Sequence, residues 1–328
     1  MNARELSRIG LGTWSIGGSG WPGGWGEQDS ADSLATIHAA LDHGVNWLDT
    51  SPLYGRGRAE MIIGQALAQR TNSRSLVQIA TKCGWPWVGR RKRPFARLTG
   101  ASIRDELNSS LRRLRTDRID LYQIHHPTPA GQLEEGWEEL ARQRERGVIG
   151  AAGICNCTVS DLERLSSIAP VSTVQIPYNL LQRDAEETLL PYCRRHGIAV
   201  LASSPLQNGM LTTRFDRKRV AQLPGNDWRR QHPNFQEPRL SSYLEVIQDL
   251  RAAVENQPLA RIALGWVLAQ PGVHAAILGA RLPRQVNEAL RPWPNLNEEN
   301  VASLITAKLR SHPLASQRSS PHESEPSR

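Results

Sequence analysis

Val45-Asn46-Trp47-Leu48-Asp49-Thr50-Ser51-Pro52-Leu53-Tyr54-Gly55 is the stretch of sequence from which the fold can be predicted. Its first four residues predict a short buried strand, and Pro52 and Gly55 predict a loop directly after it. Asp49 therefore leaves the end of a strand, and the phenol of Tyr54 follows five residues later. An aspartate beside a turn is usually a cap, and a loop tyrosine usually packs. The neighbouring strands decide whether this pair means more.

The next two predicted strands also end in polar side chains. Residues 76–81 form an apolar run that ends in Lys82, and residues 119–124 form another that ends in His125. Asp, Tyr, Lys and His thus gather where three successive strands stop. Taken singly, Asp49 and Lys82 fit a buried ion pair that braces the fold, and His125 fits a core histidine; together they indicate a catalytic site.

The alternation of strands and helices predicts an α/β fold, a single-domain (β/α)8 TIM barrel with long loops on its catalytic face. Further strands are predicted at residues 8–11, 148–154, 171–176, 198–202 and 274–278. Helices are predicted at residues 30–43, 58–69, 102–115, 133–146, 160–167, 184–197, 242–255, 259–269, 283–290 and 300–309. The barrel is expected to span residues 1–310, and the Ser-, Pro-, His- and Glu-rich residues 311–328 predict a disordered tail.

Composition excludes several other classes of protein. The formal net charge is +8 and only four of the 40 basic residues are lysine, but the arginines are spread over many segments, so no nucleic-acid partner is predicted. The four cysteines form no C-x-x-C pair and have no metal-ligand spacing to histidines, so we expect reduced thiols and no metal. Without a signal pattern or a long apolar run, the chain is expected to be soluble and cytoplasmic, with no membrane partner.

Three loops invite functional interpretations. Gly18, Gly20 and Gly23 formally match G-x-G-x-x-G, but Pro22 argues against the helix that a dinucleotide fingerprint needs, so residues 17–26 are interpreted as a loop over the barrel mouth. Residues 207–238 form a long connection, typical of a lid or of a disordered segment. The arginine-rich loop at residues 90–97 is either a solvated basic loop or an entrance that favours anionic substrates.

The motifs at the strand ends resemble those of a known family. They are Asp49-Thr50-Ser51-x-x-Tyr54-Gly55, Thr81-Lys82-Cys83-Gly84, Ile119-Asp120-Leu121-Tyr122-x-x-His125, Gly153 to Cys157 as a variant of G-x-S-N-F, Ser204-Pro205-Leu206, and Gly279-Ala280-Arg281. On these motifs the chain resembles the aldo/keto reductase superfamily, from about residue 9 to about residue 309. The resemblance is to its bacterial NADP-dependent branch, and some motif spellings are similar to those of aldose dehydrogenases.

The resemblance implies an oxidoreductase whose catalytic residues are Asp49, Tyr54, Lys82 and His125. Tyr54 would be the general acid in carbonyl reduction and the base in alcohol oxidation. An unperturbed phenol has a pKa near 10, and an adjacent ammonium such as that of Lys82 lowers it. Asp49 would hold Lys82 in place, and His125 would orient the carbonyl.

The resemblance also implies that the cofactor is NADP(H). The residues that match cofactor-binding positions are Thr13, Trp14, Cys155, Asn156, Gln175, Ser203, Ser204, Pro205, Leu206, Gly209, Gly279, Arg281, Gln285 and Glu288. Arg281 is expected to face the adenosine 2′-phosphate. Three positions depart from the family pattern: Cys155 stands where a serine is usual, Ser203 stands where an aromatic ring often stacks on the nicotinamide, and Ala289 replaces a frequent asparagine.

A carbonyl compound or a sugar is the expected substrate, in a pocket formed by Trp14, Trp85 and His126. Aldose 1-dehydrogenase activity is one alternative. A nicotinamide-binding regulatory subunit with little turnover is a second, and a lyase that uses Lys82 as a Schiff base is a third.

Overall fold

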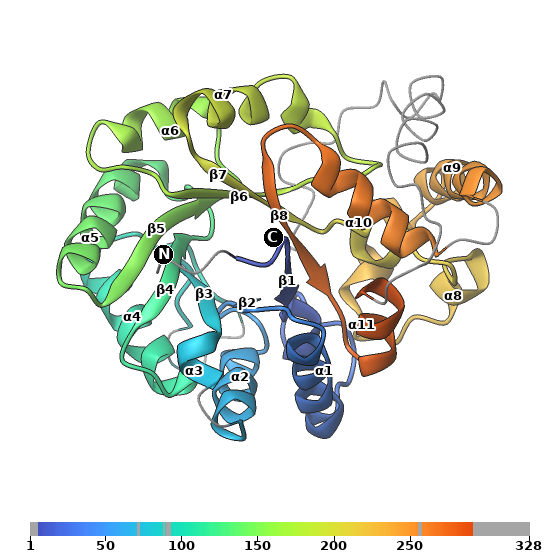
Figure 1. The fold of residues 1–328 in the computed structure, drawn as a ribbon, viewed down its shortest axis with the longest axis horizontal. Helices are drawn as coiled ribbons and strands as arrows, with labels where there is room; N and C mark the ends of the chain where they lie inside the picture. The colour runs from blue at the N-terminus through green and yellow to red at the C-terminus, as the bar shows by residue number, and fades with distance from the viewer. Residues whose placement is uncertain (1–5, 71–72, 88, 90–92, 255–257, 291–328) are drawn as a thin grey trace.

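Eight parallel strands close into a barrel in the order β1 to β8 in the computed structural model, which describes residues 6–70, 73–87, 89, 93–254 and 258–290 (Figure 1). The strands are β1 (Ile9–Gly12), β2 (Trp47–Asp49), β3 (Gln78–Cys83), β4 (Ile119–Ile124), β5 (Ile149–Cys155), β6 (Thr173–Pro177), β7 (Ala199–Ser203) and β8 (Val273–Gly279). The predicted TIM barrel is confirmed.

Helices surround the ring of strands on the outside (Figure 1). They are α1 (Ser30–Asp42), α2 (Arg58–Ala68), α3 (Ser73–Leu76), α4 (Gly100–Leu114), α5 (Leu133–Glu145), α6 (Val159–Ser166), α7 (Leu189–His196), α8 (Arg217–Ala221), α9 (Arg239–Val254), α10 (Leu259–Ala269) and α11 (Pro283–Leu290). The predicted helix at residues 300–309, the boundary at residue 310 and the predicted tail lie outside the described residues.

The floor of the barrel is filled by a large side chain from the stretch quoted first. Trp47 is buried inside the ring, in a cluster with Ala80, Leu121, Ala151, Leu201, Ala275 and Ile277. Its indole Nε1 donates to the carbonyl oxygen of Ser7 at 2.9 Å. Room for the indole comes from Gly10 on β1, since a Cβ there would lie 2.2 Å from the Trp47 ring. One small residue and one large residue thus share this layer of the barrel.

A capping side chain and a proline explain where two of the helices begin. Asp29 caps α1, because its carboxylate accepts from the backbone N–H groups of Ala31 and Asp32. The helix predicted at residues 184–197 is shorter in the structure: Asp184 lies in a separate 3-10 turn, and α7 begins only at Leu189. Pro191 explains the late start, because proline is tolerated in the first turn of a helix and not in its interior.

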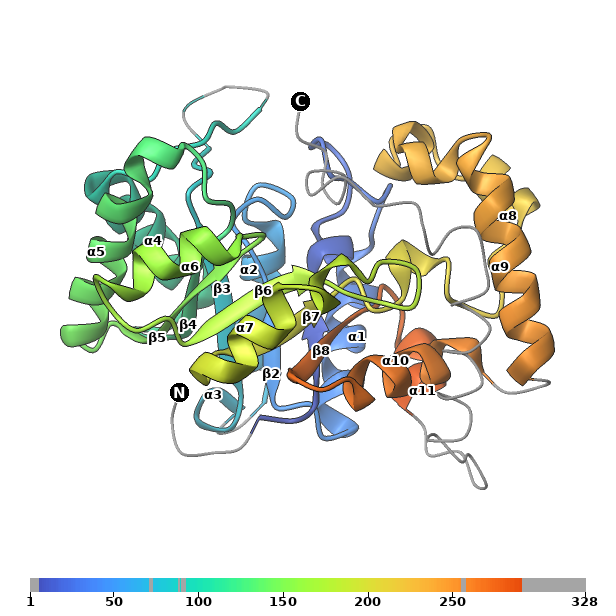
Figure 2. The same cartoon turned by 90° about the horizontal axis from the view of Figure 1, so that it is seen from above.

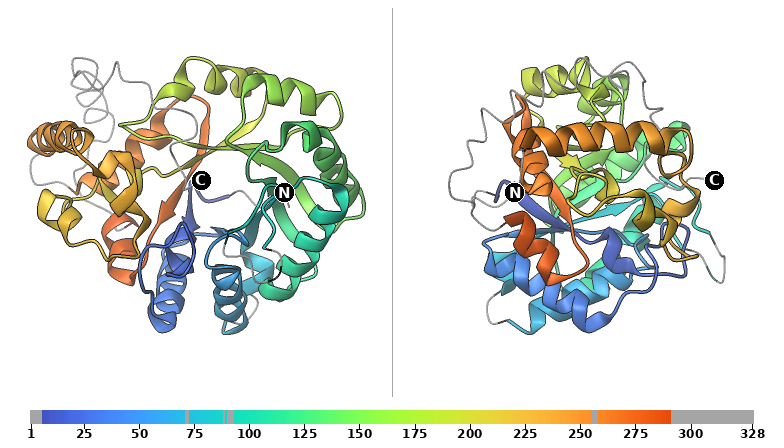
Figure 3. Two further views of the ribbon diagram at one scale, coloured as in Figure 1. Left: turned by 180° about the vertical axis from the view of Figure 1, so that it is seen from behind. Right: turned by 90° about the vertical axis from the view of Figure 1, so that its right-hand side faces the viewer.

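The connection at residues 207–238 is folded into short helices. They are η4 (Gln207–Gly209), α8, η5 (Trp228–Gln231) and η6 (Pro233–Phe235). Figure 2 shows α8 and α9 beside each other at one side of the molecule, and both face the viewer in the right-hand panel of Figure 3. The loop before α1 also behaves as predicted, because α1 begins at Ser30, well after Gly23, so the glycine pattern does not open a helix.

Two features are absent from the described residues. In that part of the chain, no helix is long and apolar enough to cross a membrane. No group of three or more His, Cys, Asp or Glu side chains among the same residues could hold a metal ion.

Replacing Gly10 with alanine should destabilise the folded barrel. The new Cβ would meet Trp47 ring atoms at 2.2 to 2.5 Å, and the indole is locked by its hydrogen bond to Ser7. We expect a loss of about 1–3 kcal/mol in the free energy of unfolding, measured by urea denaturation. Gly131→Ala is the matched control, because a Cβ added there would meet no atom within 4 Å. Equal stability of the two variants would contradict this account of the floor.

Candidate active site

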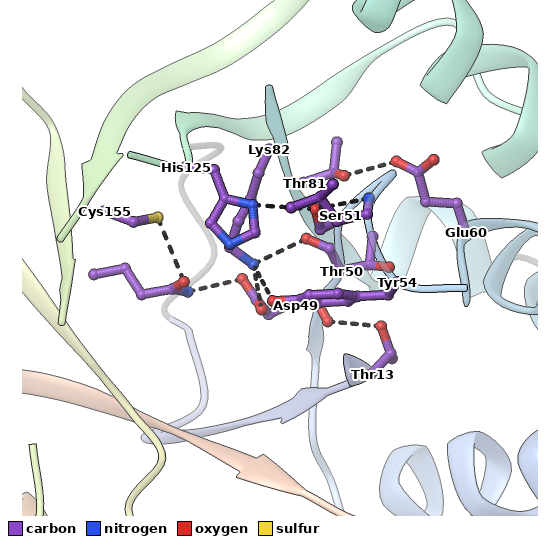
Figure 4. A network of polar contacts seen from close by, with 12 residues as sticks. Thr13, Asp49, Thr50, Ser51, Tyr54, Glu60, Thr81, Lys82, His125 and Cys155 are labelled. Carbon is purple, nitrogen blue, oxygen red and sulfur yellow. Dashed lines mark hydrogen bonds and ion pairs between the residues drawn. The ribbon is translucent and has the colours of Figure 1, made fainter. Parts of the chain in front are cut away.

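A buried lysine stands at the centre of the polar network at the carboxyl ends of the strands (Figure 4). The Lys82 ammonium donates to Asp49 Oδ2 at 2.8 Å, to the carbonyl oxygen of Thr50 at 3.0 Å and to the phenol oxygen of Tyr54 at 3.2 Å. These three hydrogen bonds use all three ammonium hydrogens. The network therefore fixes both the aspartate and the phenol around one cation.

Asp49 is held from several other directions. Its Oδ1 accepts from Gln175 Nε2 at 2.8 Å, and Gln175 Oε1 accepts from the Cys155 thiol at 3.4 Å. Its backbone carbonyl accepts from both the N–H and the hydroxyl of Thr13, each at 2.9 Å. Both carboxylate oxygens thus have partners, which a buried charge requires.

The protonation state of Lys82 follows from these contacts. Burial alone would lower its pKa, but the Asp49 carboxylate, with Tyr54 and Cys155, outweighs that effect and raises the pKa of Lys82 well above its ordinary value. The side chain is therefore an ammonium throughout the physiological range. Because this ammonium donates to the phenol oxygen, the proton of Tyr54 points away from Lys82.

His125 lies directly after β4, and its ring centroid is 6.1 Å from that of Tyr54 in an edge-on arrangement. Its backbone N–H donates to the carbonyl of Cys83 at 3.0 Å, and its carbonyl accepts from Asn156 Nδ2 at 3.1 Å. Asn156 itself has φ = 55°, in the left-handed region that asparagine tolerates better than most residues. The three predicted strand ends, which carry Asp49, Lys82 and His125, therefore lie close together in the structure.

A cavity of about 230 Å³ opens beside this network. Asp49, Tyr54 and His125 line it, whereas Lys82 is fully buried behind them. Most residues predicted to bind the cofactor also line it, namely Trp14, Asn156, Gln175, Ser203, Ser204, Pro205, Leu206, Gly209, Gly279, Arg281, Gln285 and Glu288. Thr13 and Cys155 do not line it; both are buried and bond to Asp49 and Gln175 respectively.

Four arginines and two phenylalanines that line the cavity were not predicted from the sequence. They are Arg214, Arg219, Arg229, Arg284, Phe215 and Phe235. Most of them belong to the long connection at residues 207–238. Its length alone signalled a lid, but no spacing rule indicated which of its side chains would face inward.

Arg281 is engaged by the loop before α1. Its Nε donates to Gln28 Oε1 at 2.8 Å, one terminal nitrogen to the carbonyl of Trp25 at 2.6 Å, and the other to the carbonyl of Glu27. Burial, followed by the charge of Arg229, lowers the pKa of its guanidinium. The residue expected to face a phosphate therefore also ties the loop to β8.

The same loop meets the long connection across the cavity. Trp25 pairs with Asp227 in an antiparallel bridge, and the backbone N–H of Trp228 donates to Gly24 at 2.8 Å. Arg229 forms an ion pair with Asp227 at 2.7 Å and lies 4.3 Å above the Trp25 ring. We refer to residues 24–28 together with 227–229 as the clasp.

No aromatic residue stands at the strand end where the resemblance leads one to expect a ring under the nicotinamide. Ser203 occupies that position and lines the cavity. Tyr178, which directly follows β6, stacks on Trp266 at 5.6 Å and donates to Glu186, so its ring is committed elsewhere. Trp14 lines the cavity, and its ring stacks on Trp228 at 5.1 Å and on Tyr54 at 6.3 Å.

A second aromatic wall surrounds the phenol on its outer side. Trp14, Trp21, Trp85 and Trp87 pack against the cluster that contains Tyr54. His126 stacks on His125 at 5.0 Å and meets the edge of Trp85 at 5.8 Å. The loop that carries Trp85 is anchored from below, since Glu106 accepts from the backbone N–H groups of Gly84 and Trp85 at 3.1 and 3.3 Å. Residues 90–92 of the basic loop lie outside the described part of the chain.

Comparisons with known proteins agree with this geometry. Residues 8–308 match the model of the Aldo/keto reductase family. The chain is 38% identical over 308 residues to the aldo-keto reductase YhdN of Bacillus subtilis, covering 92% of this chain and 90% of that protein. It is 33% identical to the NADH-specific methylglyoxal reductase of Escherichia coli, covering 86% and 88%. The structure of the glycerol dehydrogenase AKR11B4 from Gluconobacter oxydans superposes with a TM-score of 0.80, at 36% identity and 96% coverage of both chains.

Glu106 should make the stability of the protein fall as the pH rises. Burial raises the pKa of its carboxyl to about 8 despite the two backbone N–H donors. Because the folded-state pKa exceeds the ordinary value of 4.5, this contribution is full below pH 4.5 and is lost as the pH rises through about 8. Glutamine at this position cannot ionise, so the melting temperature of Glu106→Gln relative to the wild type should increase from pH 6 to pH 9.

Glu139→Gln is the control for this experiment. Burial opposes its ionisation, but Gln143, Arg142 and Arg104 prevail and hold the pKa of the Glu139 carboxyl below its ordinary value. Its stabilising contribution is therefore lost only on acidification. The difference between Glu139→Gln and the wild type should stay constant from pH 6 to pH 9, and a constant difference for Glu106→Gln as well would refute the assignment.

Proposed function

The chain belongs to the aldo/keto reductase family and is an oxidoreductase that reduces carbonyl groups or oxidises alcohols; from this premise we propose that Tyr54 is its general acid and base. The observation that carries the proposal is the set of three hydrogen bonds from Lys82 to Asp49, Thr50 and Tyr54. A fixed ammonium beside a phenol oxygen stabilises the phenolate that forms when the proton leaves.

In the reducing direction, the substrate oxygen lies where His125 and Tyr54 can both donate to it. His125 orients the carbonyl, and Tyr54 gives up its proton as negative charge develops on the oxygen. Lys82 keeps its own proton and stabilises the phenolate, while Asp49 keeps Lys82 in place. In the oxidising direction, the phenolate accepts the alcohol proton.

The family uses a nicotinamide cofactor, and the cavity suits one. When bound, the nicotinamide supplies or accepts the hydride. Asn156 and Gln175 line the cavity beside Asp49, where they would hold the carboxamide. Ser204, Gln207 and Asn208 all adopt positive φ, and such strained backbone clusters at ligand-binding loops; this supports a pyrophosphate site after β7.

We further propose that the cofactor is NADP(H) rather than NAD(H). Arg281 and Arg284 line the same cavity, and a guanidinium suits a phosphate dianion. Arg281 already serves the loop before α1, whereas Arg284 is exposed. Arg284 is therefore the better candidate for discriminating between the cofactors, with Arg281 holding the loop beside it.

Small aldehydes with an apolar body are the substrates that we favour, because four tryptophans pack against the buried cluster that contains Tyr54. Oxidation of a polyol or sugar is the second candidate, supported by the similarity to a glycerol dehydrogenase. A screen of aldehydes, diketones, sugars and polyols for consumption of NADPH, or for formation of NADPH from NADP⁺, separates the two.

The Schiff-base lyase is disfavoured, because Lys82 is fully buried and held as an ammonium. The four cysteines are free and buried, which supports a reducing, cytoplasmic location.

Tyr54→Phe should remove most turnover while leaving cofactor affinity nearly intact, because it deletes the proton donor and keeps the ring. We expect kcat to fall by about 10² to 10⁴, the usual value of general acid–base help. Steady-state kinetics and cofactor fluorescence titrations provide the two readouts. Tyr192→Phe is the matched control, since Tyr192 lies on α7 and stacks on His196. If Tyr54→Phe kept more than about a tenth of the wild-type kcat, another group would have to be the acid.

Arg284→Ala should weaken NADPH by about tenfold, the value of one hydrogen bond to a charged group, and leave NADH nearly unchanged. Arg281→Ala should weaken both cofactors, because it also releases the loop at Trp25 and Glu27. Arg195→Ala on the outer helix α7 is the control. Tighter binding of NADH than NADPH by the wild type, in the same titrations, would reject NADP(H).

A further inference from the structure

Ser51, two residues after the end of β2, contacts the ring of His125. Ser51 Oγ lies 3.3 Å from Nδ1 of His125, and both residues are almost completely buried. In Figure 4 the second ring nitrogen of His125 lies on the opposite side of the ring from Ser51. The role of Ser51 therefore depends on which of the two atoms carries the proton between them.

The turn that follows β2 settles how Ser51 can bond. The carbonyl of Ser51 accepts from the N–H of Tyr54 at 3.1 Å, which closes a four-residue turn with Pro52 in its second position. The side-chain oxygen of Ser51 accepts from the N–H of Leu53, also at 3.1 Å. One lone pair of the hydroxyl is thus committed to the turn, and the turn places both Ser51 and Tyr54.

Counting hydrogens then assigns the direction of the contact with His125. A hydroxyl has one proton to donate, and among the described residues the only acceptor in contact with Ser51 Oγ is Nδ1 of His125. If Nδ1 carried a proton, the Ser51 hydrogen would be buried without an acceptor, which is unfavourable. The arrangement without this penalty has Ser51 donating to an unprotonated Nδ1.

We propose that Ser51 is a positioning residue that fixes His125 as the tautomer with its proton on Nε2. The inference rests on the proposed function of His125 as the group that orients the carbonyl. With Nδ1 occupied by Ser51, the Nε2–H is the donor that faces the substrate oxygen, and the imidazole plane is held from one edge by Ser51 and from one face by His126. Ser51 acts through His125 and does not touch the substrate.

The direct test is ¹⁵N NMR of the protein labelled at histidine and saturated with NADP⁺. His125→Gln removes one set of resonances and so identifies those of His125. We expect Nδ1 to show the shift of an unprotonated, hydrogen-bonded nitrogen and Nε2 that of a protonated one. A proton on Nδ1 in the wild type would overturn the proposal.

Ser51→Ala should change the same spectrum and the kinetics together. Its Nδ1 resonance should move towards that of a nitrogen without a hydrogen bond, and kcat should fall by about 3- to 30-fold, the range for losing one orienting hydrogen bond. Thr81→Val is the matched control: it deletes another fully buried hydroxyl, which donates to Glu60 at 2.7 Å, and should leave the His125 resonances in place.

The outcomes separate this proposal from the function on which it rests. Unchanged His125 resonances and unchanged kcat in Ser51→Ala would show that Ser51 positions nothing. Full activity of His125→Gln would instead refute the proposed role of His125, whatever the tautomer proves to be.

Discussion

The ion pair between Lys82 and Asp49, 2.8 Å long and shut off from solvent, is the constraint on which the rest of this site depends. Taking two charges out of water costs several kcal/mol for each, and the attraction between them offsets this only if every remaining hydrogen-bonding atom is satisfied. Thr50, Tyr54 and Gln175 meet that condition around the pair. Since an apolar pair would usually be as stable or more so, its presence at the strand ends is better explained by the chemistry of Tyr54 than by stability.

Unlike the catalytic strand ends, the clasp beside the cavity is built from segments far apart in the chain. The clasp joins residues 24–28 to residues 227–229 through a backbone bridge, an ion pair and stacked rings. Arg281 connects the same loop to β8. Trp25, Arg229 and Arg281 all line the cavity, so these long-range contacts also fix the shape of the cavity.

Much of this arrangement was predictable because strand ends carry strong local signals. A short apolar run that stops at a polar residue places Asp49, Lys82 and His125 at the same rim of any parallel barrel. The start of the helix predicted at residues 184–197 was wrong because Asp184 is a good capping residue, whereas Pro191 further along determines where α7 begins. Arg229 of the long connection was missed because its position depends on the clasp, a contact between segments about 200 residues apart. Local pattern cannot encode such a contact.

The positions of the protons in the site follow from which hydrogen-bonding atoms already have partners. Lys82 donates to the phenol oxygen, so the Tyr54 proton must point elsewhere. If Ser51 donates to Nδ1 of His125, the second ring nitrogen holds the remaining proton. Two donors then meet at the cavity, and a carbonyl oxygen has two lone pairs with which to accept them. Of these two donors, the phenol is the one that accepts a hydrogen bond from the Lys82 ammonium, which is why the proposed function assigns proton transfer to Tyr54 and orientation to His125. The different roles proposed for Tyr54 and His125 thus follow from their different buried partners, Lys82 and Ser51.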